Sequence, residues 1–171
     1  MKIGDILVKK SKIAGRGIFA TKSYKKKEFV FQPIGRIVHA RNVNWPSLGK
    51  KEYNYLQISA WKYLVPQDLR LKCTNHSCNP NLGVKILEDK ISLVAIKPIK
   101  KGQELTFDYS TTMLEEWDEK KMKCNCGSKN CRKEIGDFRN VPKKIRIKYI
   151  RLGVVPQYIL DNLERKPPIE K

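Results

Sequence analysis

Short runs of apolar residues, three to six residues long and separated by turn residues, recur through the first two thirds of the chain. Runs of this length, bounded by glycine, proline or charged residues, predict short β-strands. We expect the first strands at residues 6–8, 17–20, 29–31 and 34–38. Runs at 82–87 and 91–96 flank the polar Glu88-Asp89-Lys90 and predict a hairpin. The turn Lys100-Lys101-Gly102 then leads into a strand expected over 104–109.

Three other segments follow different patterns. Residues 42–70 carry scattered aromatic side chains and predict less regular structure, whereas the polar segment 113–123 has apolar residues at near-helical spacing and predicts a short helix. The tail, 139–171, has helical spacing interrupted at Gly153 and Pro156, which predicts two short helices. The expected fold class is therefore mostly β, with many short strands and a short helical tail.

The charge balance is strongly basic. The chain has 171 residues, enough for one domain with a buried core, and its 36 Lys and Arg against 17 Asp and Glu give a formal charge of +19. Such a field attracts polyanions. One interpretation is that the protein works near nucleic acid, chromatin or a ribosome. The other is that a lysine-rich composition only gives a solvated basic surface.

Cysteine usage and hydropathy indicate the compartment. The five cysteines are an odd number and three of them lie within 124–131, which does not fit a disulfide framework. The N-terminal residues contain no apolar signal segment, and no apolar run reaches the roughly 18 residues of a membrane span. We expect a soluble, reduced, intracellular protein without membrane contacts.

The cysteine cluster Cys124-x-Cys126-x4-Cys131 has the spacing of a metal site. Thiolates at this density favour zinc, and a structural zinc ion takes four ligands in a tetrahedron. Three cysteines therefore need a fourth ligand from elsewhere in the chain, and the alternative is that these are ordinary reduced cysteines. The candidates for the fourth ligand are the thiols of Cys73 and Cys78 and the imidazoles of His39 and His76.

Three further motifs accompany this cluster. Asn75-His76-Ser77-Cys78-Asn79-Pro80-Asn81 is dense in hydrogen-bonding side chains, Glu104-Leu105-Thr106-Phe107-Asp108-Tyr109 ends an apolar run on a tyrosine, and Gly15-Arg16-Gly17-Ile18-Phe19-Ala20 places two glycines before a strand. With the cysteines, all four closely resemble, in order and separation, the motifs of the SET-domain protein lysine methyltransferases. The resemblance covers about residues 5–138 and is to compact bacterial-type members.

The resemblance implies a fold of several small antiparallel sheets around a knot-like core. It divides the chain into a SET domain at 1–110 with a variable insert at 42–70, a linker and post-SET zinc segment at 111–138, and a basic, helical tail at 139–171. S-adenosyl-L-methionine and the target lysine would enter from opposite faces.

The resemblance also assigns a cofactor-binding set, for which tight turns or core packing are the alternatives: Gly15, Arg16, Gly17, Tyr55, Asn75 and His76. Glycine would let main-chain groups approach the cofactor closely. In the family, Arg-Phe is common where this chain has Lys72-Cys73, so a bidentate guanidinium is lost there.

Cys78 is the fourth zinc ligand that the resemblance implies. The zinc ion, Zn(2+), would then be structural, held by Cys78, Cys124, Cys126 and Cys131, and would fold the post-SET segment over the active site. Ile135 and Phe138 could supply a lid to the lysine channel, with plain packing as the alternative. Lys133 stands where a glycine is common.

Tyr109 is the catalytic tyrosine that the resemblance implies. The lysine amine must lose its proton before it can attack a methyl group, because its ordinary pKa is about 10.4. An apolar channel and the cofactor's positive charge would lower this pKa, and a tyrosine hydroxyl would orient the amine. Phe107 lies two residues earlier, on the same face of the expected strand, and would leave room for di- or trimethylation.

The leading hypothesis is thus an S-adenosylmethionine-dependent protein lysine N-methyltransferase. One alternative is a non-catalytic, zinc-containing SET-like module that binds nucleic acid or a protein partner, and another is methyl transfer to a nucleophile other than lysine. The expected substrate is a histone-like, DNA-packaging or ribosomal protein, with weak nucleic-acid contact through the basic surface. We expect the protein in the cytoplasm or on a nucleoid or chromatin, with export into a host as an alternative.

Overall fold

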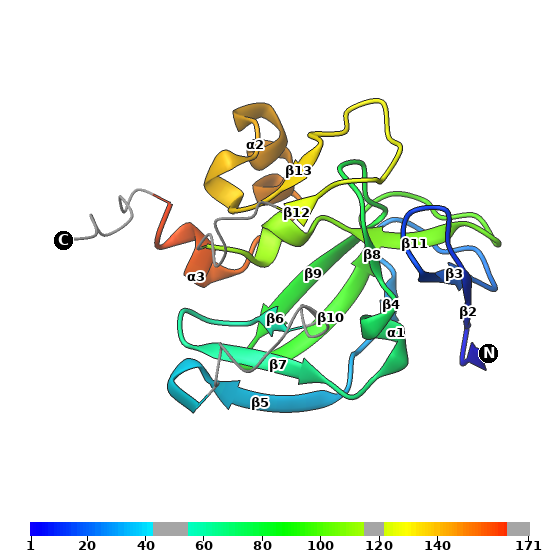
Figure 1. The fold of residues 1–171 in the computed structure, drawn as a ribbon, viewed down its shortest axis with the longest axis horizontal. Helices are drawn as coiled ribbons and strands as arrows, with labels where there is room; N and C mark the ends of the chain where they lie inside the picture. Colours follow the sequence, from blue (N-terminus) through cyan, green and yellow to red (C-terminus); the bar gives the residue numbers. More distant parts are fainter. Residues whose placement is uncertain (43–54, 115–121, 164–171) are drawn as a thin grey trace.

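Residues 1–42, 55–114 and 122–163 are described by a computed structural model, in which several small β-sheets pack around a common core (Figure 1). The four early strands expected from the apolar runs are confirmed, as β2 (Ile6–Lys10), β3 (Arg16–Ala20), β4 (Phe29–Phe31) and β5 (Gly35–His39). Across the described ranges, no helix is both long enough and apolar enough to cross a membrane.

A five-stranded sheet joins segments that are far apart in the sequence. Its order is β1-β2-β3-β11-β8, with β1 at Lys2–Ile3, β11 at Glu104–Phe107 and β8 at Asn75–His76. Its strands pair antiparallel except for β11 and β8, which run parallel. The sheet therefore brings the glycine motif, the Glu104–Phe107 motif and the Asn75–His76 motif side by side, with β8 at the edge.

The predicted hairpin is confirmed as β9 (Leu82–Leu87) and β10 (Lys90–Ala95), with β4 on the other edge of β10. Glu88 and Asp89 form the turn with φ of 48° and 62°. These left-handed values at two successive residues are those of a type I′ turn, whose twist matches the twist of the two strands.

The segment 42–70 is more regular than its sequence pattern indicates. Residues 43–54 lie outside the described ranges, but β6 (Leu56–Gln57) and β7 (Lys62–Pro66) pair with each other and β7 pairs with β5. A short helix, α1 (Leu69–Lys72), follows and leads into β8. The pattern failed here because β6 has only two residues and β7 ends on a proline.

The C-terminal tail packs on the sheets instead of standing apart from them. As predicted, it forms two short helices, α2 (Lys143–Arg151) and α3 (Gln157–Leu160), separated by Gly153 at φ 64° and Pro156. Tyr149, Phe138 and Ile159 are almost fully buried in one cluster with Val94 and Ile96 of the β10 region. Burying a large apolar side chain contributes roughly 1.5–3 kcal/mol, so the helices are held by this cluster. Residues 164–171 lie outside the described ranges.

One prediction around Tyr109 is wrong, and another fails at the two ends that the structure describes. The strand expected over 104–109 ends at Phe107, and Tyr109 begins a 3-10 helix, Tyr109–Thr112, because the Asp108 carboxylate caps it by accepting the Ser110 N–H at 3.2 Å. The helix expected over 113–123 is absent at both described ends: residues 113–114 are irregular, and Met122–Lys123 forms β12, which pairs with β13 (Glu134–Ile135). Residues 115–121 lie outside the described ranges.

Candidate active site and metal centre

The parallel pairing of β8 with β11 builds the centre of the candidate site. His76 lies opposite Phe107, and the Ser77 N–H donates to the Phe107 carbonyl at 3.1 Å. Because main-chain groups alternate along a strand, the N–H and C=O of His76 point to the edge away from β11, where none of the described strands pairs. This edge leaves one donor and one acceptor for a ligand.

The side chain of Asn75 hydrogen-bonds the glycine motif to this centre. Its amide nitrogen lies 3.2 Å from the carbonyl oxygens of both Ala14 and Arg16, and 2.8 Å from Oε1 of Glu104. The Glu104 carboxylate also accepts the hydroxyl of Ser11 at 2.7 Å. Sequence reasoning assigned no role to Glu104, which connects β11, β8 and the loop before β3.

The two glycines of the motif have different surroundings. Gly15 has φ +44° with open space where a Cβ would lie, which suits close approach by a ligand. A Cβ on Gly17 would collide with the Glu104 carboxylate, so a larger residue there would displace the side chain that Ser11 and Asn75 bind. The Arg16 side chain is exposed, and Tyr55 lies just before β6 in a different sheet. The cofactor role of these residues stays a prediction.

Tyr109 lies in van der Waals contact with the β8 and β11 side chains. Its ring centroid is 4.9 Å from that of Phe107 and 5.4 Å from that of His76. Its hydroxyl donates to the Thr74 carbonyl at 2.7 Å, and its N–H donates to Nδ1 of His76 at 3.1 Å. Phe107 and Tyr109 thus meet although they do not share one face of a strand.

The environment of Tyr109 keeps its hydroxyl neutral. Burial, and secondly the nearby Cys73 thiol, raise the pKa of Tyr109 to about 12. A phenol with this pKa is protonated at neutral pH and is a poor general base. The hydroxyl donates its proton to the Thr74 carbonyl, and its oxygen can still accept a hydrogen bond from a ligand through its lone pairs.

His76 connects the active-site strand to the cysteines. Burial lowers the pKa of His76 to about 4, against the opposing charge of Asp108. Since Nδ1 accepts a bond from Tyr109, the neutral ring carries its proton on Nε2, which lies 3.3 Å from the sulfur of Cys78. The ring therefore orients one cysteine of the cluster.

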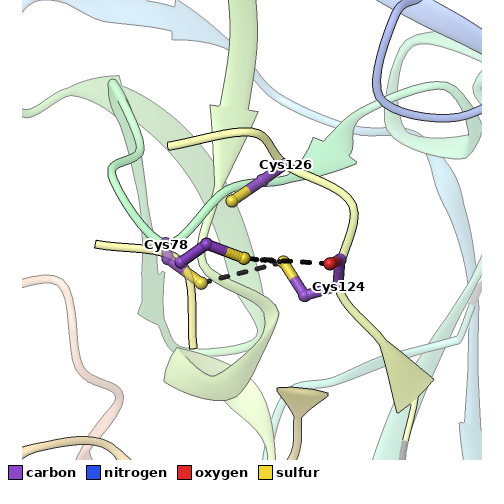
Figure 2. Close-up of side chains that lie close together, drawn as sticks. Cys78, Cys124 and Cys126 are labelled. Carbon is purple, nitrogen blue, oxygen red and sulfur yellow. Dashed lines mark hydrogen bonds between the residues drawn. The ribbon is translucent and has the colours of Figure 1, made fainter. Parts of the chain in front are cut away.

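The four cysteines expected to bind zinc lie together, and Figure 2 shows three of them, Cys78, Cys124 and Cys126. All four sulfur atoms are within 4.8 Å of one another, and Sγ of Cys124 is 3.8 Å from that of Cys78 and 3.6 Å from that of Cys131. Four sulfurs around zinc at about 2.3 Å would be roughly 3.8 Å apart, so the cluster fits this ion. Of the other candidates, Cys73 lies in the main core and His39 in β5, whereas His76 lies beside the cluster, with Nε2 3.3 Å from the sulfur of Cys78.

The chemistry around the sulfurs also suits a bound cation. Burial raises the pKa of the Cys78 thiol, so its charged form needs compensation. The main-chain N–H of Arg132 donates to Cys78 at 3.3 Å and that of Lys133 to Cys131 at 3.4 Å, contacts that favour thiolates. The cluster could therefore hold a structural zinc ion.

Asp108 is the centre of a buried polar network that sequence reasoning missed. It is 1% exposed, and Arg132 donates to both of its carboxylate oxygens at 2.7 Å. The Tyr149 hydroxyl from α2 donates to the same carboxylate at 3.1 Å, and Arg132 also donates to the Ser110 hydroxyl at 3.2 Å. The sequence held one signal for this network, because Asp108 precedes Tyr109 and Arg132 follows Cys131. Nothing in the sequence around Tyr149 indicates that it belongs to the network.

The residues proposed for the lid lie in two places. Ile135 is 5% exposed and packs with the cysteine cluster, against which Tyr109 also packs. Phe138 is fully buried in the cluster with the tail helices, which indicates a packing role. Lys133 has φ 68°, a backbone conformation that favours the glycine common at this position.

Comparison with known proteins supports the arrangement. The family model described as the SET domain matches residues 15–110. Human histone-lysine N-methyltransferase 2D is 32% identical over 139 residues, covering 75% of this chain and 2% of that protein. A histone-lysine N-methyltransferase, H3 lysine-36 specific, from Eremothecium gossypii is 25% identical over 178 residues, covering 98% of this chain and 24% of that protein.

A solved structure shares the fold. The crystal structure of KRYPTONITE in complex with mCHG DNA and SAH is similar with a TM-score of 0.62 and 26% identity, over 75% of this chain and 28% of that chain. The expected mostly β architecture is confirmed. The chain spans a quarter or less of the two relatives' lengths.

Proposed function

Because this chain belongs to the SET-domain family, we propose that it is a protein-lysine N-methyltransferase that uses S-adenosyl-L-methionine. The observation that carries the proposal is the position of Tyr109. Its ring contacts His76, beside the open edge of β8, and its neutral hydroxyl is fixed by Thr74. This arrangement places one oriented phenol next to main-chain groups that no described strand pairs, which supports alignment of an amine for methyl transfer.

The residues present fit the cofactor. The main-chain N–H and C=O of His76 at the β8 edge would bind an adenine-like group, and the open space at Gly15 would admit its methionyl part. Asn75 acts indirectly, because its side chain holds the glycine loop in place. When bound, the cofactor supplies a methyl group on a positively charged sulfur.

The reaction is a direct displacement. The lysine amine would first lose its proton to solvent, and its nitrogen would then accept the methyl group that the bound cofactor supplies, with sulfur as the leaving group. A channel lined by Phe107 and Tyr109 would favour the neutral amine by desolvation. The Tyr109 oxygen would align the amine, so this residue contributes orientation and electrostatic stabilisation and no proton transfer.

The names of the relatives support a proposal for the substrate class. Proteins similar to this chain are named histone-lysine N-methyltransferases. We therefore propose a histone-like, DNA-packaging or ribosomal protein as substrate, inside the cell. Phe107 is 5% exposed and carries no hydroxyl that could hold a water in the channel, which supports di- or trimethylation.

A labelled-methyl assay tests the proposal. The protein is incubated with S-adenosylmethionine labelled in its methyl group and with fractionated cell protein, and label on lysine is measured. Wild type should transfer label, Tyr109→Phe should lose at least about 100-fold in rate, as expected for loss of one orienting group, and Tyr24→Phe, a buried tyrosine outside the site, should stay active. A wild-type protein that binds partners but transfers no label would instead be a non-catalytic SET-like module.

A further inference from the structure

A hollow lies on the molecule away from the site described above. It has a volume of about 420 Å³ and is bounded by the loop before β4, by β9 and β10, and by the turn that follows α2. Val94 and Val154 are among the apolar residues at its base, and four basic side chains line it: Lys26, Lys27, Lys85 and Arg151. We call it the basic hollow.

The frame of the basic hollow is rigid. The Lys27 N–H donates to the Ala95 carbonyl at 2.7 Å, and the Ala95 N–H donates to the Glu28 carbonyl at 2.9 Å, which holds the loop on β10. On the other side, Val154 packs so closely on Gly83 that any Cβ there would collide with it. The four basic residues are therefore presented by fixed backbone.

The next feature of the basic hollow is the charge of its four cations. Among the residues that the structure describes, no ion pair involves any of them. Glu28, the acid in the same loop, accepts the Lys25 N–H at 2.7 Å and lies near Lys22. Like charges around one hollow repel one another, so a bound anion would stabilise the arrangement.

The positive charge continues beyond the hollow along α2. Lys144, Lys148 and Arg151 are exposed at positions i, i+4 and i+7, which places them on one face of the helix over about 10 Å. A stripe of this length exceeds a single phosphate group and corresponds to roughly three phosphate charges of one strand, counted at 3.4 Å per charge along the duplex axis.

We propose that the basic hollow, with the exposed face of α2, binds the phosphodiester backbone of a nucleic acid. Contacts of this kind carry charge and not base sequence, so binding should be independent of sequence and strongly dependent on salt. The site does not depend on methyl transfer. It would hold the protein on a nucleic acid while leaving the β8 edge free.

Salt-dependent binding to a short fluorescent DNA duplex tests this proposal on the full chain. The variant Lys85→Gln/Arg151→Gln removes two cations from the hollow, and Lys2→Gln/Lys10→Gln removes two exposed cations from β1 and β2. Each lost phosphate contact lowers the slope of log affinity against log salt by about 0.9. For Lys85→Gln/Arg151→Gln, the magnitude of this slope should therefore fall by about 1.8. The variant should bind DNA roughly 60-fold more weakly than wild type at 0.1 M salt.

The control variant should change affinity by less than about threefold, because neither Lys2 nor Lys10 lines the hollow or belongs to α2. Equal losses in both variants would overturn the proposal, since surface charge as a whole would then be responsible. Two other results would also overturn the proposal. In the first, inorganic phosphate binds the hollow, but DNA binding does not depend on the hollow. In the second, Lys85 and Arg151 are needed for binding to phosphatidylserine vesicles and not for binding to DNA.

Discussion

The guanidinium of Arg132 donates two hydrogen bonds, each 2.7 Å long, to the two carboxylate oxygens of Asp108. One residue stands directly after the last cysteine of the cluster and the other directly before Tyr109. The pair is buried, with side-chain exposures of 15% and 0%. It therefore joins the cysteine segment to the strand end that carries the candidate catalytic tyrosine, and Tyr149 attaches α2 to the same carboxylate.

Removal of the guanidinium should separate these parts. We expect Arg132→Ala to lower the free energy of unfolding by about 3 kcal/mol, because it leaves a buried carboxylate without its charged partner. Methyl transfer should fall as well, since Tyr109 would lose its fixed position. Urea unfolding and the labelled-methyl assay measure the two effects.

A conservative variant separates charge from geometry. Arg132→Lys keeps the charge but loses the two-point contact, so its stability should lie between that of wild type and that of the alanine variant. Lys144→Ala, on the exposed face of α2, should change stability by less than about 0.5 kcal/mol. If Arg132→Ala were as stable as Lys144→Ala, the pair would not hold the segments together.

Cys78 and Cys73 make a matched pair for the metal site. Both are buried thiols, but only Cys78 lies in the four-sulfur cluster. Wild type should contain about one zinc ion per chain, Cys78→Ser should lose most of it, and Cys73→Ser should retain it. Elemental analysis of the purified proteins measures this. Full zinc occupancy in Cys78→Ser would show that another residue supplies the fourth ligand.

The raised pKa of Tyr109 predicts a loss of stability at high pH. Between pH 10 and 12 the unfolded tyrosine ionises while the folded one, with a pKa of about 12, stays neutral, so stability falls as pH rises. At pH 11 this difference is about 1.4 kcal/mol. From pH 9 to pH 11, the free energy of unfolding should therefore decrease by about 1.4 kcal/mol less in Tyr109→Phe than in wild type. Parallel curves for the two proteins would contradict the buried position of the hydroxyl.

Phe107 should control how many methyl groups a lysine receives. A hydroxyl added beside Tyr109 can hold a water molecule in the channel and take the space of a further methyl group. We expect Phe107→Tyr to shift the product towards monomethyl-lysine while the first transfer continues. Mass spectra of a modified protein over time give the product distribution, and an unchanged distribution would exclude this role.

The sequence was sufficient for features whose signal is local. Short apolar runs predicted β2 to β5 and the β9–β10 hairpin, and cysteine spacing predicted the cluster. Features that depend on distant contacts were missed. The capping of Tyr109–Thr112 by Asp108 ended β11 two residues early, and the position of Tyr149 depends on how α2 packs against Phe138. Glu104 was overlooked because its partners, Ser11 and Asn75, lie far from it in the chain.

The central claim is that Tyr109 orients a lysine for methylation. The most direct measurement is mass spectrometry of methylated lysines in a native extract incubated with S-adenosylmethionine and either wild-type protein or Tyr109→Phe. The account predicts methyl groups on lysines of one or a few proteins with wild type, and loss of these marks with Tyr109→Phe while its zinc content and fold are retained. The same marks at the same rate with Tyr109→Phe would contradict it.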